Sequence, residues 1–152
     1  MRRPHPLLAA SLLAARGVAG AGPARAIEID WAAFQDESVI EILTVDPDGD
    51  PRETKVWVVV VDAAAWVRTN DSRWLANLRR DPALRLRVRD QDYAFFAEEV
   101  TDPAATGLVE EAFKAKYGWI QRVMSALRMR EPTVLRLTPR ARAAGGPRRP
   151  VG

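Results

Sequence analysis

The chain contains no cysteine, and its single histidine, His5, lies near the start of its 152 residues. Without these side chains the body of the chain cannot form a Cys/His zinc site, a Ser-His-Asp triad, a thiol nucleophile or a His-ligated haem. The missing cysteines also remove any disulfide framework from which a redox compartment could be inferred. What remains is carboxylate chemistry, or chemistry that a bound cofactor supplies.

Acidic residues are missing from both ends of the chain. Residues 1–26 and 140–152 contain eight arginines and no Asp or Glu, whereas the whole chain has a net charge of +3. Subtracting these eight charges leaves residues 27–139 at −5. This distribution argues against a uniformly basic, DNA-wrapping domain, so we predict no nucleic-acid partner. Nucleic-acid binding through the basic ends would instead depend strongly on salt and would disappear when residues 140–152 are deleted.

No apolar run approaches the roughly 20 residues that span a bilayer. Residues 1–26 do combine Arg2 and Arg3 with an apolar run over residues 7–15 and small residues at 24–26, which is typical of a secretory signal. Arg16 shortens the apolar run, so two interpretations stay open. They are a cleaved signal on a periplasmic or secreted protein, and a disordered leader on a cytoplasmic one. Residues 27–139 are predicted to form one domain, and residues 140–152 a disordered basic tail.

The pattern of apolar residues predicts an α+β fold that is mainly antiparallel. Strands are expected at residues 39–45, 54–62, 66–69, 84–88, 93–100 and 134–137. The run over residues 55–61 is almost continuously apolar and β-branched, which predicts a central strand covered on both faces. Six strands joined mainly by hairpins favour a small barrel over a parallel βαβ sheet.

Turn and cap residues punctuate this pattern. The sequence Asp-Pro-Asp-Gly-Asp at residues 46–50 predicts a hairpin turn. Helices are expected after Asp30, after Asp71 or Ser72, and after Thr101 or Asp102, with a break near Gly118 and a second segment to residue 129. In the strand over residues 84–88, apolar residues alternate with a row of arginines at positions 85, 87 and 89. This row predicts a solvated sheet face, opposite glutamates 98 or 99.

Arg68, Thr69, Ser72 and Arg73 cluster where a strand ends and a helix begins. Backbone N–H groups at a helix start already favour anions, so two guanidiniums and two hydroxyls there predict a phosphate pocket. The alternative is an ordinary strand end and N-cap with both arginines solvated.

Several loose motifs follow one another in a specific order between residues 37 and 137. They are Arg52, Thr54 and Lys55 on one strand, Arg68-Thr69 and Ser72-Arg73 around a loop, Asn77-Leu78, Asp81-Pro82, Phe113 with Lys116 and Tyr117, and the terminal run 135–139. In this order they resemble the split-barrel flavin-binding superfamily, which includes pyridoxamine 5′-phosphate oxidase and the deazaflavin-dependent nitroreductases. Trp57 and Val67-Arg68 make the chain most similar to an uncharacterised branch, DUF2255.

The resemblance implies a six-stranded split β-barrel of the FMN-binding type and a homodimer with the cofactor at the subunit interface. It also implies a cofactor-binding set: Arg52, Thr54, Lys55, Trp57, Arg68, Thr69, Ser72, Arg73 and Trp74. In this set Arg52, Lys55, Thr69, Ser72 and Arg73 would neutralise phosphate, whereas Thr54, Lys55 and Trp57 would lie near the ring. Trp74 stands where the oxidase has a lysine, which leaves FMN, a deazaflavin or no cofactor open.

Two functions follow from these observations. The first is a flavin-dependent oxidoreductase that moves a hydride between a reduced nicotinamide and a small electrophile, with the ring doing the chemistry. The second is a non-catalytic flavin-binding or carrier module. Trp57 and Trp74 could also be simple core residues, and Lys116 and Tyr117 either solvated or at the pocket edge. No metal site and no catalytic side chain are identified.

Overall fold

The structure, a computed structural model, describes residues 28–126 and 130–140, with side chains for residues 28–120 and 130–140. The predicted leader, residues 141–152 of the predicted tail and the predicted helix end at residues 127–129 lie outside this range. The helices are α1 (Trp31–Asp36), α2 (Arg73–Arg80) and α3 (Pro103–Ala126). The strands are β1 (Ile40–Val45), β2 (Pro51–Val56), β3 (Val59–Val61), β4 (Ala64–Thr69), β5 (Ala83–Val88), β6 (Gln91–Val100) and β7 (Thr133–Pro139).

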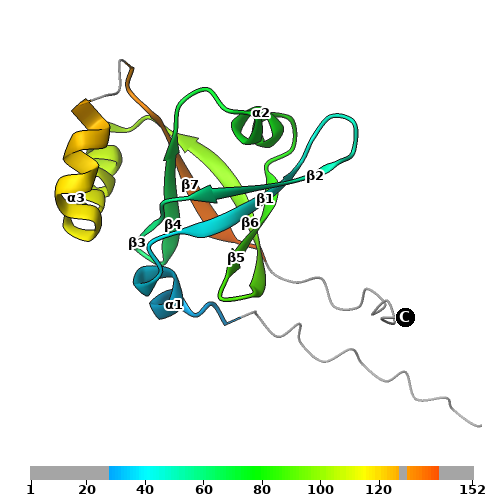
Figure 1. Cartoon of the computed structure of the whole chain (residues 1–152), viewed down its shortest axis with the longest axis horizontal. Helices are drawn as coiled ribbons and strands as arrows, with labels where there is room; N and C mark the ends of the chain where they lie inside the picture. Colours follow the sequence, from blue (N-terminus) through cyan, green and yellow to red (C-terminus); the bar gives the residue numbers. More distant parts are fainter. Residues whose placement is uncertain (1–27, 127–129, 141–152) are drawn as a thin grey trace, which may run out of the picture.

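One antiparallel sheet of seven strands forms the body of the molecule. Its strand order is β2-β1-β5-β6-β7-β4-β3, and the sheet curls into a barrel (Figure 1). This confirms the expected α+β, mainly antiparallel split barrel. The number of strands is seven rather than six because the stretch expected as one strand over residues 54–62 is two strands, β2 and β3.

The prediction that this stretch is central was wrong, since β2 and β3 form the two edges of the sheet. Only Trp57 and Val58 separate them along the chain, so these two residues carry the backbone from one edge to the other. Within this run Val56, Val58 and Val59 are buried, whereas Trp57, Val60 and Val61 are partly buried and Lys55 is exposed. Continuous apolar sequence marks burial on both faces and does not distinguish a central strand from a strand at a barrel seam.

Two side chains from α3 hold the link between the edges. The Tyr117 hydroxyl accepts from the Val58 N–H at 2.9 Å and lies 2.9 Å from the carbonyl oxygens of Val58 and Ser38. The Lys116 ammonium donates to the Val58 carbonyl at 2.8 Å and to the Phe34 carbonyl at 3.0 Å. The backbone groups of Val58 therefore have side-chain partners in place of strand partners, which explains why the ladder breaks at this residue.

Helices α1 and α2 lie at opposite ends of the barrel, and α3 packs on its outside next to β3 and β4 (Figure 1). Phe34 from α1 and Leu75 from α2 are fully buried in the main core, together with Phe95 and Leu86 from the sheet. A second, smaller core lies under α3 and contains Val59, Ala64, Trp66, Val109 and Phe113. Each amphipathic element thus buries one apolar face against the sheet.

The predicted turn and cap positions are confirmed. Asp30 and Asp102 accept from backbone N–H groups three residues later, as helix N-caps do. Gly49 has a φ of 91° in the β1–β2 turn, a conformation that glycine adopts without steric cost. Gly118 interrupts α3 with φ 56° and ψ −130°, where the break was expected.

The arginine row of β5 has other partners than expected. Arg87 bonds Asp92, Glu41 and Glu53 from neighbouring strands, whereas Glu99 pairs with Arg79 of α2. The register explains the difference, because Arg87 lies opposite Asp92 and the glutamates of β6 lie opposite β7. Among the described residues, no helix is both long and apolar enough to cross a bilayer.

Replacing Tyr117 by Phe should lower the stability of the fold by about 1–3 kcal/mol, because the buried N–H of Val58 loses its acceptor. The ring stacking of Tyr117 on its neighbours is retained in this variant. Thermal unfolding followed by circular dichroism measures the change. Glu111→Gln is the control, since Glu111 lies on the same helix and its side chain is 73% exposed. Equal melting temperatures for Tyr117→Phe and the control would contradict the role of the hydroxyl.

Candidate cofactor site

A small pocket lies where β2, β4, α2 and α3 meet. Its volume is about 220 Å³, and we call it the β2–β4 pocket; its lining residues are Lys55, Val56, Trp57, Arg68, Thr69, Trp74 and Phe113. The lining contains two cationic groups, one hydroxyl and three aromatic rings, and it contains no carboxylate. Such a set suits an anionic group attached to a flat ring.

Arg68 is the buried cation of this pocket. Only 5% of its side chain is exposed, and its guanidinium forms an ion pair with Glu110 of α3. The guanidinium carbon also lies 3.9 Å from the centre of the Phe113 ring. The planar, permanently charged guanidinium is thereby held in one orientation, as bidentate recognition of a phosphate or carboxylate requires.

Aromatic stacking fixes the opposite side of the pocket. The Trp57 and Tyr117 rings are stacked with centroids 4.5 Å apart and planes 7° apart, and Tyr117 stacks on Phe113 at 5.7 Å. Glu110, Phe113 and Tyr117 recur at helical spacing, so one face of α3 supplies all these contacts. Helix α3 therefore forms the outer wall of the β2–β4 pocket.

Lys116 and Tyr117 belong to this wall without lining the pocket. Burial lowers the pKa of Lys116, and the charges of Asp36 and Glu37 partly offset that effect. Burial raises the pKa of Tyr117, with a partial offset from its hydrogen bond to Val58. The phenol thus stays protonated at neutral pH. Of the two alternatives, solvated or at the pocket edge, neither describes these residues, because both are partly buried and bond the Val58 backbone.

The hydroxyl groups of Thr69 and Ser72 organise the start of α2. Ser72 is the N-cap, and its Oγ accepts from the Leu75 N–H at 3.3 Å. The Thr69 hydroxyl lies 3.1 Å from Ser72 Oγ and 2.9 Å from the Asn70 carbonyl oxygen. Thr69 therefore faces the pocket, and Ser72 lies one hydrogen bond behind it.

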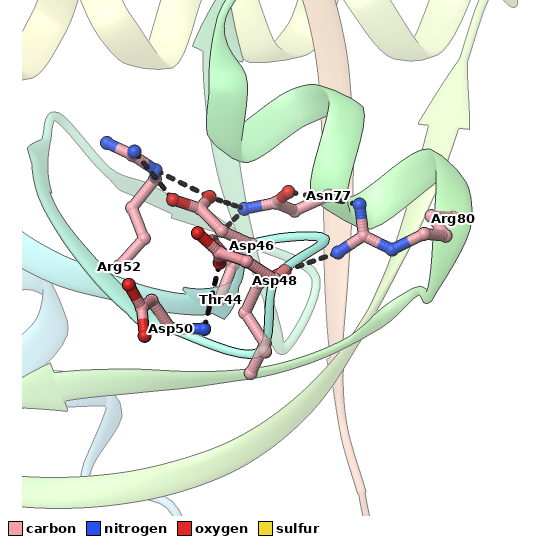
Figure 2. Close-up of polar contacts among 8 residues, drawn as sticks. Thr44, Asp46, Asp48, Asp50, Arg52, Asn77 and Arg80 are labelled. Carbon is pink, nitrogen blue, oxygen red and sulfur yellow. Dashed lines mark hydrogen bonds and ion pairs between the residues drawn. The ribbon is translucent and has the colours of Figure 1, made fainter.

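Arg52 lies in a different group, at the base of the β1–β2 turn. Its Nε and one terminal nitrogen donate to the two carboxylate oxygens of Asp46 at 2.8 and 2.7 Å. Asn77 of α2 donates to the same carboxylate at 2.7 Å and to the Thr44 hydroxyl at 3.1 Å (Figure 2). Arg80 bonds the Asn77 side-chain oxygen at 3.3 Å. This network connects the turn to α2, because the buried amide of Asn77 joins both.

The electrostatics of this network centre on Asp46. The hydrogen bond from Arg52 is the largest cause that holds the pKa of Asp46 well below its ordinary value, followed by the bond from Asn77. The charge of Arg73 is the last of the causes that lower this pKa. Asp46 thus pairs with Arg52, one of the two guanidiniums that were predicted to neutralise phosphate.

The structure divides the nine predicted cofactor-binding residues into three groups. Those that line the β2–β4 pocket are Lys55, Trp57, Arg68, Thr69 and Trp74, with Ser72 directly behind them. Arg52 is paired with Asp46, and Arg73 is exposed at the first position of α2. Thr54 is half-buried on β2, opposite Ile42.

Sequence reasoning missed the role of Glu110, whose partner is 42 residues away. It also missed a larger groove of about 860 Å³ that Arg68 lines as well, which we call the α3 groove. Its lining residues are Arg68, Glu99, Val100, Thr101, Pro103, Thr106, Gly107, Glu110, Arg130, Glu131, Pro132, Thr133 and Val134. Arg68 is the residue that lines both hollows. In the described part of the chain, no three His, Cys, Asp or Glu side chains gather as metal ligands.

Residues 30–137 match the model of one protein family, described as "Uncharacterized protein conserved in bacteria (DUF2255)". The chain belongs to the DUF2255 family. This membership confirms the branch that Trp57 and Val67-Arg68 indicated. A comparison with curated protein sequences finds no match.

Solved structures share the split-barrel fold of this DUF2255 protein at low sequence identity. The heme storage protein HutZ from Vibrio cholerae has a TM-score of 0.59 and 17% identity, covering 72% of this chain and 86% of its own. An FAD-binding protein from Mesorhizobium loti has a TM-score of 0.55 and 12% identity, with coverages of 72% and 86%. An F420-H2 dependent reductase, FDR-A, has a TM-score of 0.53 and 13% identity, with coverages of 66% and 94%. These likenesses show the fold of the DUF2255 chain.

Asp46→Asn should destabilise the DUF2255 protein at neutral pH and much less in acid. A carboxylate whose pKa is lower in the folded than in the unfolded state adds stability above its unfolded pKa, and that stability is lost as the pH falls through the folded pKa. The melting temperatures of wild type and Asp46→Asn should therefore differ at pH 7 and converge below about pH 4, the ordinary range of an aspartate. Asp50→Asn, an exposed position in the same turn, is the matched control. A difference that persists at acid pH would contradict this account.

Proposed function

We propose that this protein binds a phosphorylated flavin-type cofactor, FMN or alternatively a deazaflavin, in the β2–β4 pocket. One observation carries the proposal. The pocket combines two cations with three aromatic rings and no carboxylate, within a stretch of sequence whose net charge is −5. Proteins with this fold include one described as FAD-binding and one described as an F420-H2 dependent reductase, which supports a flavin-type ligand.

In this proposal Lys55, Arg68 and Thr69 contact the phosphate, and Ser72 orients Thr69. Trp57 and Trp74 contact the ring. Arg52 is paired with Asp46 and Arg73 is exposed, and neither lines the pocket, so in this proposal they do not contact the phosphate directly.

The reaction that we propose is hydride transfer from a reduced nicotinamide, through the bound flavin, to a small electrophile. The cofactor supplies the redox chemistry when bound. The chain would bind the phosphate, orient the ring between its tryptophans and exclude water from one side of it.

A non-catalytic flavin carrier is the second candidate. It is favoured by one observation, the absence of any carboxylate or histidine among the pocket-lining residues that could act as a general acid. HutZ is described as a heme storage protein, but a His-ligated haem in this chain would need His5. We therefore rank haem storage below flavin binding.

Absorbance of the purified protein tests cofactor binding, and anaerobic bleaching by NADH or NADPH tests catalysis. We expect flavin bands, or a rise in melting temperature with FMN or a deazaflavin. Bleaching followed by reoxidation with an added electrophile supports the oxidoreductase, whereas a coloured protein that no nicotinamide bleaches supports the carrier. A colourless protein that shows no thermal shift with FMN, FAD or deazaflavin would contradict both the oxidoreductase and the carrier.

Lys55→Met should weaken FMN binding about tenfold, the effect of losing one charge-assisted hydrogen bond. Riboflavin, which lacks the phosphate, should bind both proteins equally. Titration monitored by flavin fluorescence gives both dissociation constants. Lys114→Met is the control, because Lys114 is an exposed cation paired with Glu111 on α3. If Lys55→Met weakens the binding of riboflavin as much as the binding of FMN, Lys55 does not contact the phosphate.

The pocket also supports the proposed homodimer. Sites for ligands of this size usually measure about 300–1,000 Å³, and the β2–β4 pocket holds about 220 Å³. One copy of this chain would enclose the phosphate and the ring edge, so a second copy would cover the remainder. Exposed apolar residues on α3, Leu108 at 60% and Trp119 at 70%, are candidates for the contact.

Sedimentation velocity should therefore show a dimer at micromolar concentration, and Trp119→Glu should shift it toward monomer. A wild-type protein that stays monomeric when saturated with FMN would contradict the shared site.

A further inference from the structure

The counter-ion of the pocket arginine comes from the helix that covers the pocket. Arg68 lies in the wall between the β2–β4 pocket and the α3 groove, and its side chain is 5% exposed. A guanidinium buried to that extent needs an anion beside it in every stable state. In the structure, the Glu110 carboxylate is such an anion and forms an ion pair with Arg68.

Glu110 reaches Arg68 from the groove side. It lines the α3 groove and does not line the β2–β4 pocket, whereas Arg68 lines both. On the pocket side, the other polar groups in the lining are Lys55 and Thr69. A phosphate entering the pocket would therefore meet Arg68, the residue that Glu110 pairs with from the groove.

We propose that Glu110 competes with the phosphate of the cofactor for Arg68, so that binding transfers Arg68 from helix α3 to the ligand. This inference rests on the proposed phosphate site. The exchange is sterically feasible because 37% of the Glu110 side chain is exposed, so its carboxylate can turn into water. A phosphate carries more negative charge and more acceptor oxygens than a carboxylate, so it is the stronger partner once it is near.

Because of this exchange, the affinity of the pocket would depend on the charge of the ligand. A neutral ligand gains nothing at Arg68, because Glu110 already neutralises it. A singly charged ligand replaces one carboxylate with another group of equal charge. A ligand with a doubly charged phosphate gains from the exchange, and one face of α3 is released from the pocket wall as it binds.

The sign of one mutational effect tests the idea. Glu110→Gln removes the competing charge, so FMN should bind about tenfold more tightly, as expected when one like charge a few ångström away is removed from a partly screened site. Riboflavin should bind Glu110→Gln and wild type equally. Glu111→Gln changes the net charge by the same amount and touches Lys114 instead of Arg68, so its affinities should match those of wild type.

If Glu110 only positions Arg68, Glu110→Gln should instead bind FMN as wild type does or more weakly. That result would overturn the competition and leave the proposed function intact. If wild type binds no flavin, the proposed function fails, and inorganic phosphate then replaces FMN as the probe. A larger phosphate-induced rise in melting temperature for Glu110→Gln than for Glu111→Gln would support the competition, and equal rises would overturn it.

Glu110→Gln also removes a negative charge that compensates the buried positive charge of Arg68, so this variant could unfold. Circular dichroism checks this. If the variant is unfolded, Glu110→Asp replaces it, because its carboxylate is one methylene shorter and holds Arg68 less well. Glu110→Asp should bind FMN a few-fold more tightly than wild type; unchanged or weaker binding overturns the competition.

Discussion

The backbone of Val58 is where the two edges of the sheet and helix α3 meet. Its N–H and its carbonyl bond the side chains of Tyr117 and Lys116, so the link between β2 and β3 depends on a helix nearly 60 residues later in the chain. The barrel is therefore closed by side-chain hydrogen bonds at its seam, and strand pairing alone does not close it. Removing α3 would leave a buried N–H and a carbonyl without partners, which is costly in an apolar interior.

The same face of α3 contributes to the β2–β4 pocket. Glu110, Phe113 and Tyr117 follow one another at helical spacing. They contact Arg68 on β4 and Trp57 in the link between β2 and β3. One helix thus closes the barrel and positions both the cationic and the aromatic wall of the β2–β4 pocket. Stability and binding are coupled here, because a change that loosens α3 alters the pocket and the seam together.

Local signals in the sequence were sufficient for the turns, caps and hairpins. The cap residues Asp30 and Ser72 and the break at Gly118 act on neighbouring backbone groups, so short-range chemistry identifies them. The strand pattern favoured a small antiparallel barrel, and the resemblance carried by Arg68, Thr69 and Ser72 among others specified the split-barrel superfamily.

Long-range pairing is where sequence reasoning failed. The apolar run over residues 55–61 looked the same as a central strand, since burial at a seam and burial in mid-sheet need the same residues. Arg68 found its partner on α3, and nothing local to either residue indicates the other. Arg52 was different, because Asp46 lies in the adjoining hairpin turn and the hairpin register brings the two near each other. The pairing of Arg52 with Asp46 could therefore have been predicted from the sequence. It places Arg52 in the turn network and not in the lining of the β2–β4 pocket.

The unusual hydrogen bond at Val58 has a consequence for how opening of the molecule would be observed. Most amides in a sheet are protected from hydrogen exchange by a neighbouring strand, and they exchange only when that strand separates. The Val58 amide is protected by a phenol on α3, so it would exchange whenever α3 leaves the barrel, even with the sheet intact. The exchange rate of the Val58 amide would thus report whether α3 is packed on the barrel, at the residue that joins the two sheet edges.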